Sequence, residues 1–471
     1  MTAPTAPEGR QDSRGPDGDP TLRRNSLSGF ENVAQTLGTM APTGCLGVIV
    51  PLVIGKTGNG SWLLMLGVML VYLLILFNIN VFATRCASAG GLGTFASLGL
   101  GPKAGTLTKW VYVVAMGFGV ASSAPSAAYY GCLLINQYGG IPNTALLGAG
   151  VSSAVVLAAW WTAYRDMKLS SDVMIVIEVT SLTVMIAIIA VAMVHQGPWI
   201  DRPQLTLAGA TPRGFSAGVV ITFIIMGGFE SATTLGEESR DAQRSIPRAI
   251  LQCVLPLGLL YVVMTYLVTG LGRKFGFTLD QLEAPFDTLA RALHLPWLGS
   301  LSSAGVALSY FACTLGSMNA GARALYSLSE DRLFFRKVGI AHPRNATPHR
   351  AIAILGVLSV ATPALLLASH VSLLNVVDYL SEIAALGFIA AYFMVCLAAP
   401  FFLAKAKSLS WRGIVASSLA LLLLAIVLVQ SIYPIPDAPD CYLPYAFLAA
   451  VGAGLAFSWW FSRQNDAVAP A

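Results

Sequence analysis

Long apolar segments bounded by charged residues repeat along the whole chain. Glu31 to Lys56, Arg248 to Arg273 and Glu382 to Lys405 each enclose a stretch without charge. Each stretch exceeds the roughly 18–20 residues that an α-helix needs to cross the hydrocarbon core of a bilayer. The pattern predicts twelve membrane-spanning helices, at residues 30–54, 61–84, 106–135, 143–164, 170–195, 214–236, 247–272, 297–328, 350–369, 373–402, 411–432 and 443–462.

The composition agrees with this pattern. Hydrophobic residues make up 55% of the chain and charged residues 11%, against about 25% charged in soluble domains. The seven cysteines are scattered along mostly apolar segments, which fits small packing residues rather than a zinc site or a disulfide framework. Because no motif resembles a catalytic triad or a metal cluster, the sequence predicts neither an enzyme, a metal site nor a bound cofactor.

An even number of spans places both termini on the same side of the membrane. If that side is the cytoplasm, most of the 28 Lys and Arg residues lie in cytoplasmic loops, as the positive-inside rule requires. We therefore expect a multi-pass protein of the plasma membrane with both termini in the cytoplasm. Residues 1–28 are rich in Pro, Gly, Ser and charge, and they predict a disordered cytoplasmic tail. Residues 464–471 predict a second, short tail.

Two helix-breaking sequences interrupt the first and sixth spans. The first is Met40-Ala41-Pro42-Thr43-Gly44, and the second is Met226-Gly227-Gly228-Phe229. Proline removes a backbone donor and glycine allows non-helical angles. Irregular backbone within a bilayer is tolerated only where protein or a water-filled cavity satisfies its polar groups. Paired interruptions indicate the binding site of a secondary transporter, although a plain proline kink is an alternative for the first.

Alignment of the two interruptions divides the chain into two repeats. Spans 1–5, within residues 29–200, stand opposite spans 6–10, within residues 212–402, and spans 11 and 12 remain at residues 408–463. Because each half holds an odd number of spans, the second half enters the membrane with opposite polarity. The predicted fold is therefore an all-α polytopic 5+5 inverted repeat with two extra helices, and its two interruptions meet near the midplane.

Two acidic residues lie inside predicted spans. Glu230 follows the second interruption, and an intramembrane carboxylate costs at least about 2.5 kcal/mol. It is a candidate for substrate binding, or else a structural cap of the broken helix. Glu178 lies in an apolar stretch of span 5, where it is a candidate for taking up and releasing a proton, or else a hydrogen-bonding partner of a neighbouring helix. Asp378 and Glu382 share one helical face near the outer end of span 10, where solvated charges are common.

Three motifs on the cytoplasmic side resemble the amino acid–polyamine–organocation (APC) superfamily. Residues 236–250, GEESRDAQRSIPRAI, are similar to its loop after span 6. Residues 319–326, NAGARALY, followed by EDRLF at 330–334, resemble its span 8 and the next loop. Residues 89–95, AGGLGTF, resemble its loop between spans 2 and 3. The likeness covers roughly residues 30–400.

The resemblance implies a leucine-transporter-type fold in which a substrate's amino and carboxyl groups meet the broken spans. It also implies that spans 3 and 8 line the site and that some proton-coupled relatives carry a lysine at the position of Glu178. The chain departs from the family in this acid and in its Ala-Pro-Thr-Gly sequence, so proton and sodium coupling both stay open. The substrate-binding residues that we expect are Met40, Ala41, Pro42, Thr43, Gly44, Phe223, Gly227, Gly228, Phe229, Glu230, Ser317 and Asn319.

The sequence thus predicts a permease for amino acids or related amines that is proton-coupled and works by alternating access. The alternative within this class is a polyamine or cationic amino acid exchanger, which the acids at 230, 378 and 382 favour. A channel is disfavoured because no filter-like sequence occurs. The expected partners are the small-molecule substrate, a coupling proton and the lipid bilayer, without nucleic acid. The particular solute, symport or exchange, and the oligomeric state are left open by the sequence.

Overall fold

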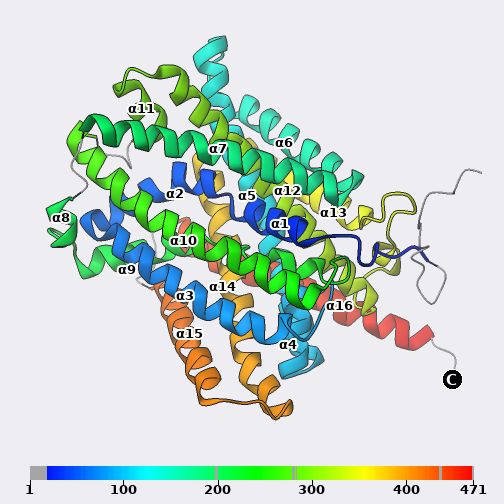
Figure 1. Ribbon diagram of the computed structural model, residues 1–471. Helices are drawn as coiled ribbons and strands as arrows, with labels where there is room; N and C mark the ends of the chain where they lie inside the picture. Colours follow the sequence, from blue (N-terminus) through cyan, green and yellow to red (C-terminus); the bar gives the residue numbers. More distant parts are fainter. Residues whose placement is uncertain (1–18, 197–199, 278–281, 283, 434–437, 469–471) are drawn as a thin grey trace, which may run out of the picture.

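The protein is a bundle of long helices, seen in a computed structural model that describes residues 19–196, 200–277, 282, 284–433 and 438–468 (Figure 1). The first part of the bundle contains α1 (Gly29–Met40), α2 (Pro42–Thr57), α3 (Ser61–Ala83), α4 (Gly91–Leu100), α5 (Pro102–Gly139), α6 (Ala145–Arg165) and α7 (Met167–Gln196). The middle part contains α8 (Arg202–Leu205), α9 (Pro212–Ile224), the 3-10 helix η2 (Ser231–Leu235), α10 (Ala242–Phe275), α11 (Pro285–Ala292) and α12 (Pro296–Glu330). The last part contains α13 (His349–Ala368), α14 (Leu373–Lys405), α15 (Trp411–Gln430) and α16 (Leu443–Val468).

Every predicted span corresponds to helix in the structure. Ten helical segments of the described residues are long and apolar enough to cross a membrane, and the first of them, Gly29–Ala83, contains the first two predicted spans. Span 6 is absent from these ten because α9 stops at Ile224 and is too short to cross alone. The predicted all-α polytopic membrane fold is confirmed, whereas the division into repeats at 29–200 and 212–402 stays a prediction.

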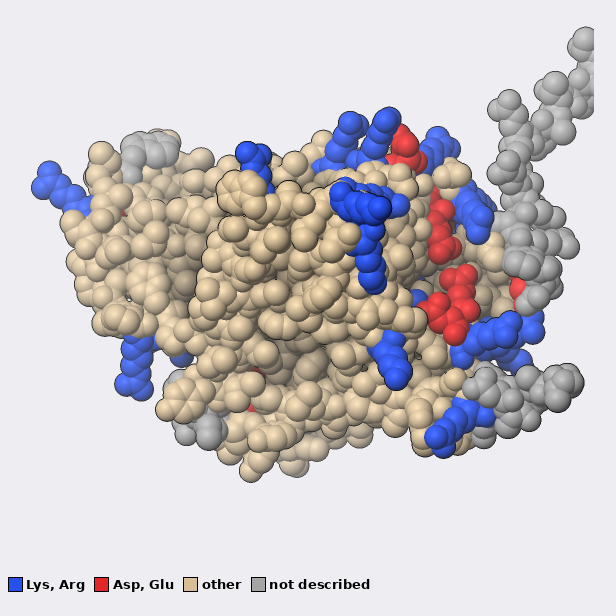
Figure 2. All heavy atoms as spheres, turned by 90° about the horizontal axis from the view of Figure 1, so that it is seen from below, with Lys and Arg blue, Asp and Glu red and all other residues tan. Residues whose placement is uncertain are grey.

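The outer surface of the bundle is apolar over its middle. Large hydrophobic side chains such as Leu157, Val263 and Leu365 lie exposed on α6, α10 and α13. Such surfaces are unfavourable in water but match the interior of a bilayer. On the face that Figure 2 shows, most of the charged side chains gather towards one end of the molecule. We call this the terminal end, because the described residues nearest both termini lie there in Figure 1.

Helices α5, α12 and α14 form the centre of the bundle. In the most apolar windows of α5 and α12, 89% and 67% of the residues are buried, against 28% in those of α6 and α15. Small residues allow this close packing. A Cβ added to Gly387 of α14 would lie 2.7 Å from the Cβ of Ala115 on α5. These three central helices lie next to the interrupted spans 1 and 6.

The tail that we expected to be disordered begins to pack at residue 19. Leu22 and Leu27 are buried, and Leu22 packs with Ala89, Tyr326 and Ala341. The N–H groups of Ser26 and Leu27 donate to the carbonyl of Glu238 at 2.8 and 2.9 Å. The prediction of a disordered tail over 1–28 is therefore wrong for 19–28, because Leu22 finds apolar partners in α12 and in two loops that are distant in sequence. Residues 1–18 lie outside the described residues.

Two other boundaries differ from the prediction. Residues 91–100, which we expected to belong to a loop, form the short helix α4. Helix α16 continues to Val468, beyond the predicted end of the last span, and residues 469–471 lie outside the described part of the chain.

Candidate functional site

The first span is broken at Ala41. Helix α1 ends at Met40, Ala41 takes the left-handed conformation with φ 44° and ψ 60°, and α2 starts at Pro42. Proline at the first position of α2 has no N–H to continue the ladder of α1, so the backbone is free to turn. The predicted interruption of span 1 is confirmed.

The sixth span is broken over a longer stretch. After α9 ends at Ile224, the chain makes turns in which Gly228 has φ 84°, and it resumes as η2 from Ser231 to Leu235. The left-handed φ of Gly228 favours glycine because a side chain would strain the backbone. The predicted interruption of span 6 is confirmed.

The two breaks lie against each other and against α12. A Cβ added to Gly228 would lie 2.5 Å from Cγ2 of Thr39 in α1. The hydroxyl of Ser231 donates to the carbonyl of Gln35 at 3.3 Å, and Nε2 of Gln35 donates to the carbonyl of Gly316 at 2.8 Å. The irregular segments of spans 1 and 6 therefore meet in the interior of the bundle, beside α12.

Glu178 of α7 faces the first turn of α2. Its side chain is fully buried, and its Oε1 accepts a hydrogen bond from the hydroxyl of Ser309 at 2.7 Å. That hydroxyl in turn accepts the N–H of Gly44 at 3.0 Å. Thr43 lies beside the same carboxyl group. Glu178 thus connects α7, α12 and the break in span 1, and the helix N-terminus is a favourable place for a negative charge.

Glu230 lies just after the turn of the second break and is also fully buried. Its Oε2 accepts the hydroxyl of Tyr392 at 2.5 Å, and the oxygen of that hydroxyl accepts the N–H of Gly228 at 3.1 Å. Its Oε1 has no hydrogen-bond partner among the described residues. Tyr112 of α5 lies beside the carboxyl group. A buried carboxyl oxygen without a partner is expensive unless a proton or a ligand satisfies it.

Aromatic rings surround this second carboxyl group. Phe229 packs at 5.3 Å from Tyr72 and at 5.4 Å from Tyr392, measured between ring centroids. Phe223 stacks on Tyr72 at 4.9 Å, and its carbonyl accepts the hydroxyl of Tyr72 at 2.6 Å. A carboxylate among aromatic faces is an environment that attracts an ammonium group, through both charge and the cation–π effect.

The remaining predicted site residues occupy different places. Met40 and Phe229 are buried at the two breaks, and a Cβ on Gly227 would lie 3.2 Å from the ring of Phe388. Ser317 faces α5, 3.2 Å from where a Cβ of Gly119 would lie. Asn319 lies one turn before Arg323, and its Nδ2 makes no hydrogen bond within the described residues.

Sequence reasoning missed two side chains that complete the site. Ser309 joins Glu178 to the amide of Gly44, and Tyr392 joins Glu230 to the amide of Gly228. A serine or a tyrosine in an apolar span ordinarily bonds within its own helix or packs in the core. Neither residue therefore carried a signal of its own. The described residues contain no group of three or more His, Cys, Asp or Glu side chains placed to hold a metal ion.

The terminal end is closed by a buried ion pair. Nε and Nη2 of Arg323 donate to the carboxylate of Glu238 at 2.5 and 3.0 Å, and both side chains are almost fully buried. A second pair joins Lys109 of α5 to Asp331 just after α12, at 2.5 Å. These pairs fasten the segment after η2 to α12, and α12 to α5.

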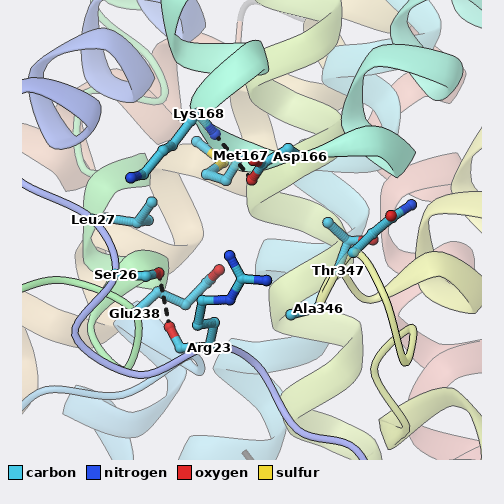
Figure 3. Close-up of a pocket in the computed structure, with 10 residues that line it drawn as sticks. Arg23, Ser26, Leu27, Asp166, Met167, Lys168, Glu238, Ala346 and Thr347 are labelled. Atoms are coloured by element: carbon cyan, nitrogen blue, oxygen red, sulfur yellow. Dashed lines mark hydrogen bonds between the residues drawn. The ribbon is translucent and has the colours of Figure 1, made fainter. Parts of the chain in front are cut away.

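Figure 3 shows a small pocket that Glu238 of the buried pair helps to line, between residues 19–28, the junction of α6 and α7, and the loop before α13. Its lining residues are Arg23, Ser26, Leu27, Asp166, Met167, Lys168, Glu238, Asn345, Ala346 and Thr347. In this view the Arg23 side chain points into the middle of the pocket, whereas that of Lys168 runs along its upper edge towards Leu27. It lies at the terminal end and is separate from the two breaks.

Comparison with known proteins agrees with this geometry. A sequence profile of the amino acid permease family matches residues 27–461. The chain is 22% identical over 395 residues to the branched-chain amino acid permease BcaP of Bacillus subtilis, covering 81% of each chain. It is 25% identical over 288 residues to the low-affinity putrescine importer PlaP of Escherichia coli, covering 58% of this chain and 60% of the importer. The chain belongs to the amino acid permease family, and it is a membrane transporter rather than an enzyme.

Proposed function

We propose that this protein is a secondary active transporter that carries amino acids or related amines across the plasma membrane, coupled to protons, by alternating access. The observation that carries the proposal is the meeting of two helix breaks, each with a fully buried carboxyl group beside it. Glu178 lies at the break in span 1, and Glu230 lies at the break in span 6. Broken spans supply unpaired backbone groups for a polar solute, and buried acids supply sites for protons or cations.

The two ends of an amino acid fit the two breaks. Backbone at Ala41–Gly44 offers a helix N-terminus to the substrate carboxylate. Glu230 offers a carboxyl oxygen without a partner, among aromatic rings, to the amino group. The similarity to a branched-chain amino acid permease and to a putrescine importer supports a substrate that carries an amine.

Alternating access requires a gate on each side of the site. We assign the terminal end to the cytoplasm, following the distribution of Lys and Arg. The pair of Arg323 and Glu238 then belongs to the cytoplasmic gate. Rocking of α1, α2, α3, α9, η2 and α10 against the other helices would separate this pair and release the substrate inwards.

The second candidate is a polyamine or cationic amino acid exchanger. Asp378 and Glu382 stand near Asp440 at the end opposite the termini. Acids grouped at the outer end of the protein attract cations and raise their local concentration. This cluster favours substrates with a net positive charge.

Uptake into proteoliposomes tests the function. Purified protein is reconstituted, and labelled leucine, lysine and putrescine are offered with a pH gradient, a sodium gradient or no gradient. Accumulation driven by the pH gradient supports proton symport. Accumulation driven only by sodium would contradict proton coupling. Uptake that requires internal substrate would identify an exchanger. The absence of any uptake would contradict the proposed transport function.

Replacement of Glu178 by glutamine is expected to uncouple transport. Glutamine keeps the shape of the side chain but cannot gain or lose a proton, so the pH gradient no longer drives accumulation while exchange of substrate across the membrane continues. Both rates are measured in the same proteoliposomes. Accumulation at the wild-type level would assign Glu178 a structural role.

Replacement of Glu230 by alanine is expected to weaken binding of amines most. The change removes the only carboxyl group enclosed by Tyr112, Phe229 and Tyr392 within the described residues. Loss of an ionic hydrogen bond costs about 1.5–3 kcal/mol, or roughly tenfold to a hundredfold in affinity. Competition assays with putrescine and leucine measure the effect. Unchanged affinity for every substrate would leave Glu230 with a structural role alone.

A further inference from the structure

The N-terminus of α2 has few free donors. A helix normally leaves the N–H groups of its first turn without a partner in the helix. Here Pro42 has no N–H, and the N–H of Ala41 donates to the carbonyl of Gly38 at 3.2 Å. The N–H of Cys45 already donates to the carbonyl of Ala41 at 2.9 Å. The N–H groups of Thr43 and Gly44 are the two in this turn that face a side chain instead of a backbone carbonyl.

Both of these donors lie at the carboxyl group of Glu178, Thr43 directly and Gly44 through the hydroxyl of Ser309. Oε2 of Glu178 and Oγ1 of Thr43 have no hydrogen-bond partner among the described residues, and both side chains are fully buried. The helix N-terminus is thus a carboxylate site that is filled from within.

We infer that Glu178 and the carboxylate of a substrate compete for the N-terminus of α2 at Thr43 and Gly44, so that a substrate with a carboxylate binds only when Glu178 carries a proton. This inference rests on the proposed function of an amino acid or amine permease. One proton from solution adds to a carboxylate oxygen of Glu178, and the substrate carboxylate takes the place of the negative charge. On release of the substrate the proton returns to solution, which gives one proton per carboxylate.

Among the residues that the structure describes, no ion pair of a basic side chain with Glu178 relieves this competition. The titratable groups around Glu178 are Cys45 on α2, Tyr261 on α10 and Cys313 on α12. Thiols and phenols are ordinarily neutral below about pH 8. Within the described part of the chain, no Lys, Arg or His side chain forms an ion pair with Glu178. The negative charge at the N-terminus of α2 therefore comes either from the carboxylate of Glu178 or from the carboxylate of the substrate.

The consequence separates two classes of substrate. An α-amino acid needs the proton on Glu178. The amine left after its decarboxylation has no carboxylate to place at α2, so it binds whether or not Glu178 is protonated. The same site therefore takes amino acids at acidic pH and amines over a wider range of pH.

Matched pairs of ligands test the inference on the purified full-length protein. Affinities for leucine and 3-methylbutylamine, and for lysine and cadaverine, are measured between about pH 5.5 and 8, where the amino groups stay protonated. We expect the affinity for each amino acid to fall by up to about tenfold per pH unit, the limit for linkage to one proton. The affinity for each amine should stay within about twofold. Equal pH dependence in both members of a pair would overturn the inference.

Two variants sharpen the test. Glu178→Gln should abolish the pH dependence of amino acid binding while the binding itself persists at every pH. Asp172→Asn, an exposed acid on the same helix, is the matched control and should keep the wild-type dependence. A wild-type dependence in Glu178→Gln contradicts the inference. If neither member of any pair binds or is transported, the proposed function is wrong. If both members of a pair are transported with equal pH dependence, the proposed function stands, and only the inferred competition between Glu178 and the substrate carboxylate is wrong.

Discussion

Replacement of Arg323 by glutamine is expected to lower the free energy of unfolding by about 3–5 kcal/mol, the usual cost of leaving one member of a buried ion pair alone. Arg323 is almost fully buried, and it donates twice to Glu238 and once to the carbonyl of Asn319. Without it, the Glu238 carboxylate is buried with no cation to pair with. The melting temperature of the purified protein, measured at fixed detergent and pH, reports the loss.

The double variant Arg323→Gln and Glu238→Gln separates the lost charge pair from lost packing. Two neutral amides can hydrogen-bond to each other, so the double variant should recover part of the stability. Arg244→Gln is the matched control, because Arg244 faces Asp241 at 3.9 Å with both side chains 75% exposed. A surface pair contributes about 0–1 kcal/mol. A melting temperature in Arg323→Gln equal to that of the control would show that the buried pair does not hold the terminal end.

Substitution of Gly228 by alanine is expected to reduce substrate uptake about tenfold or more. At φ 84° the residue lies in a region that side chains rarely adopt, and the added Cβ would lie 2.5 Å from Thr39. Such strain costs on the order of 1–3 kcal/mol, and it falls where the two breaks touch. Initial rates of uptake, normalised to the amount of folded protein in the liposomes, give the measurement.

Gly150 provides the control for this substitution. It lies within α6, and an added Cβ there meets no atom within 4 Å. Alanine favours helix over glycine by roughly 0.5–1 kcal/mol, so Gly150→Ala should transport as the wild type does and be equally or more stable. Wild-type uptake by Gly228→Ala would mean that the turn at the second break tolerates movement and does not shape the site.

The helices and both breaks follow from local sequence. Long uncharged segments leave helix as the way to satisfy the backbone in a bilayer, and Pro42 and Gly228 mark the breaks because their backbone requirements are local. The ends of the helices are less certain: α3 ends at Ala83 against a predicted 84, whereas α10 begins at Ala242 against a predicted 247.

The partners of the buried acids do not follow from local sequence. Ser309 reaches Glu178 across 131 positions of the chain, and Tyr392 reaches Glu230 across 162. Such pairs are set by how the helices pack. The prediction of a disordered tail fails at residues 19–28 for the same reason. The burial of Leu22 depends on Tyr326 and Ala341, which come from distant parts of the chain.

The structure of the protein with a bound substrate tests the central claim most directly. The ligand should be the one with the highest affinity among the amino acids and amines in the binding assays. We predict that it lies between the break at Ala41–Gly44 and the break at Gly227–Phe229, with its amino group at Glu230. A substrate bound away from both breaks, at the terminal-end pocket lined by Arg23 and Lys168 for example, would contradict the account.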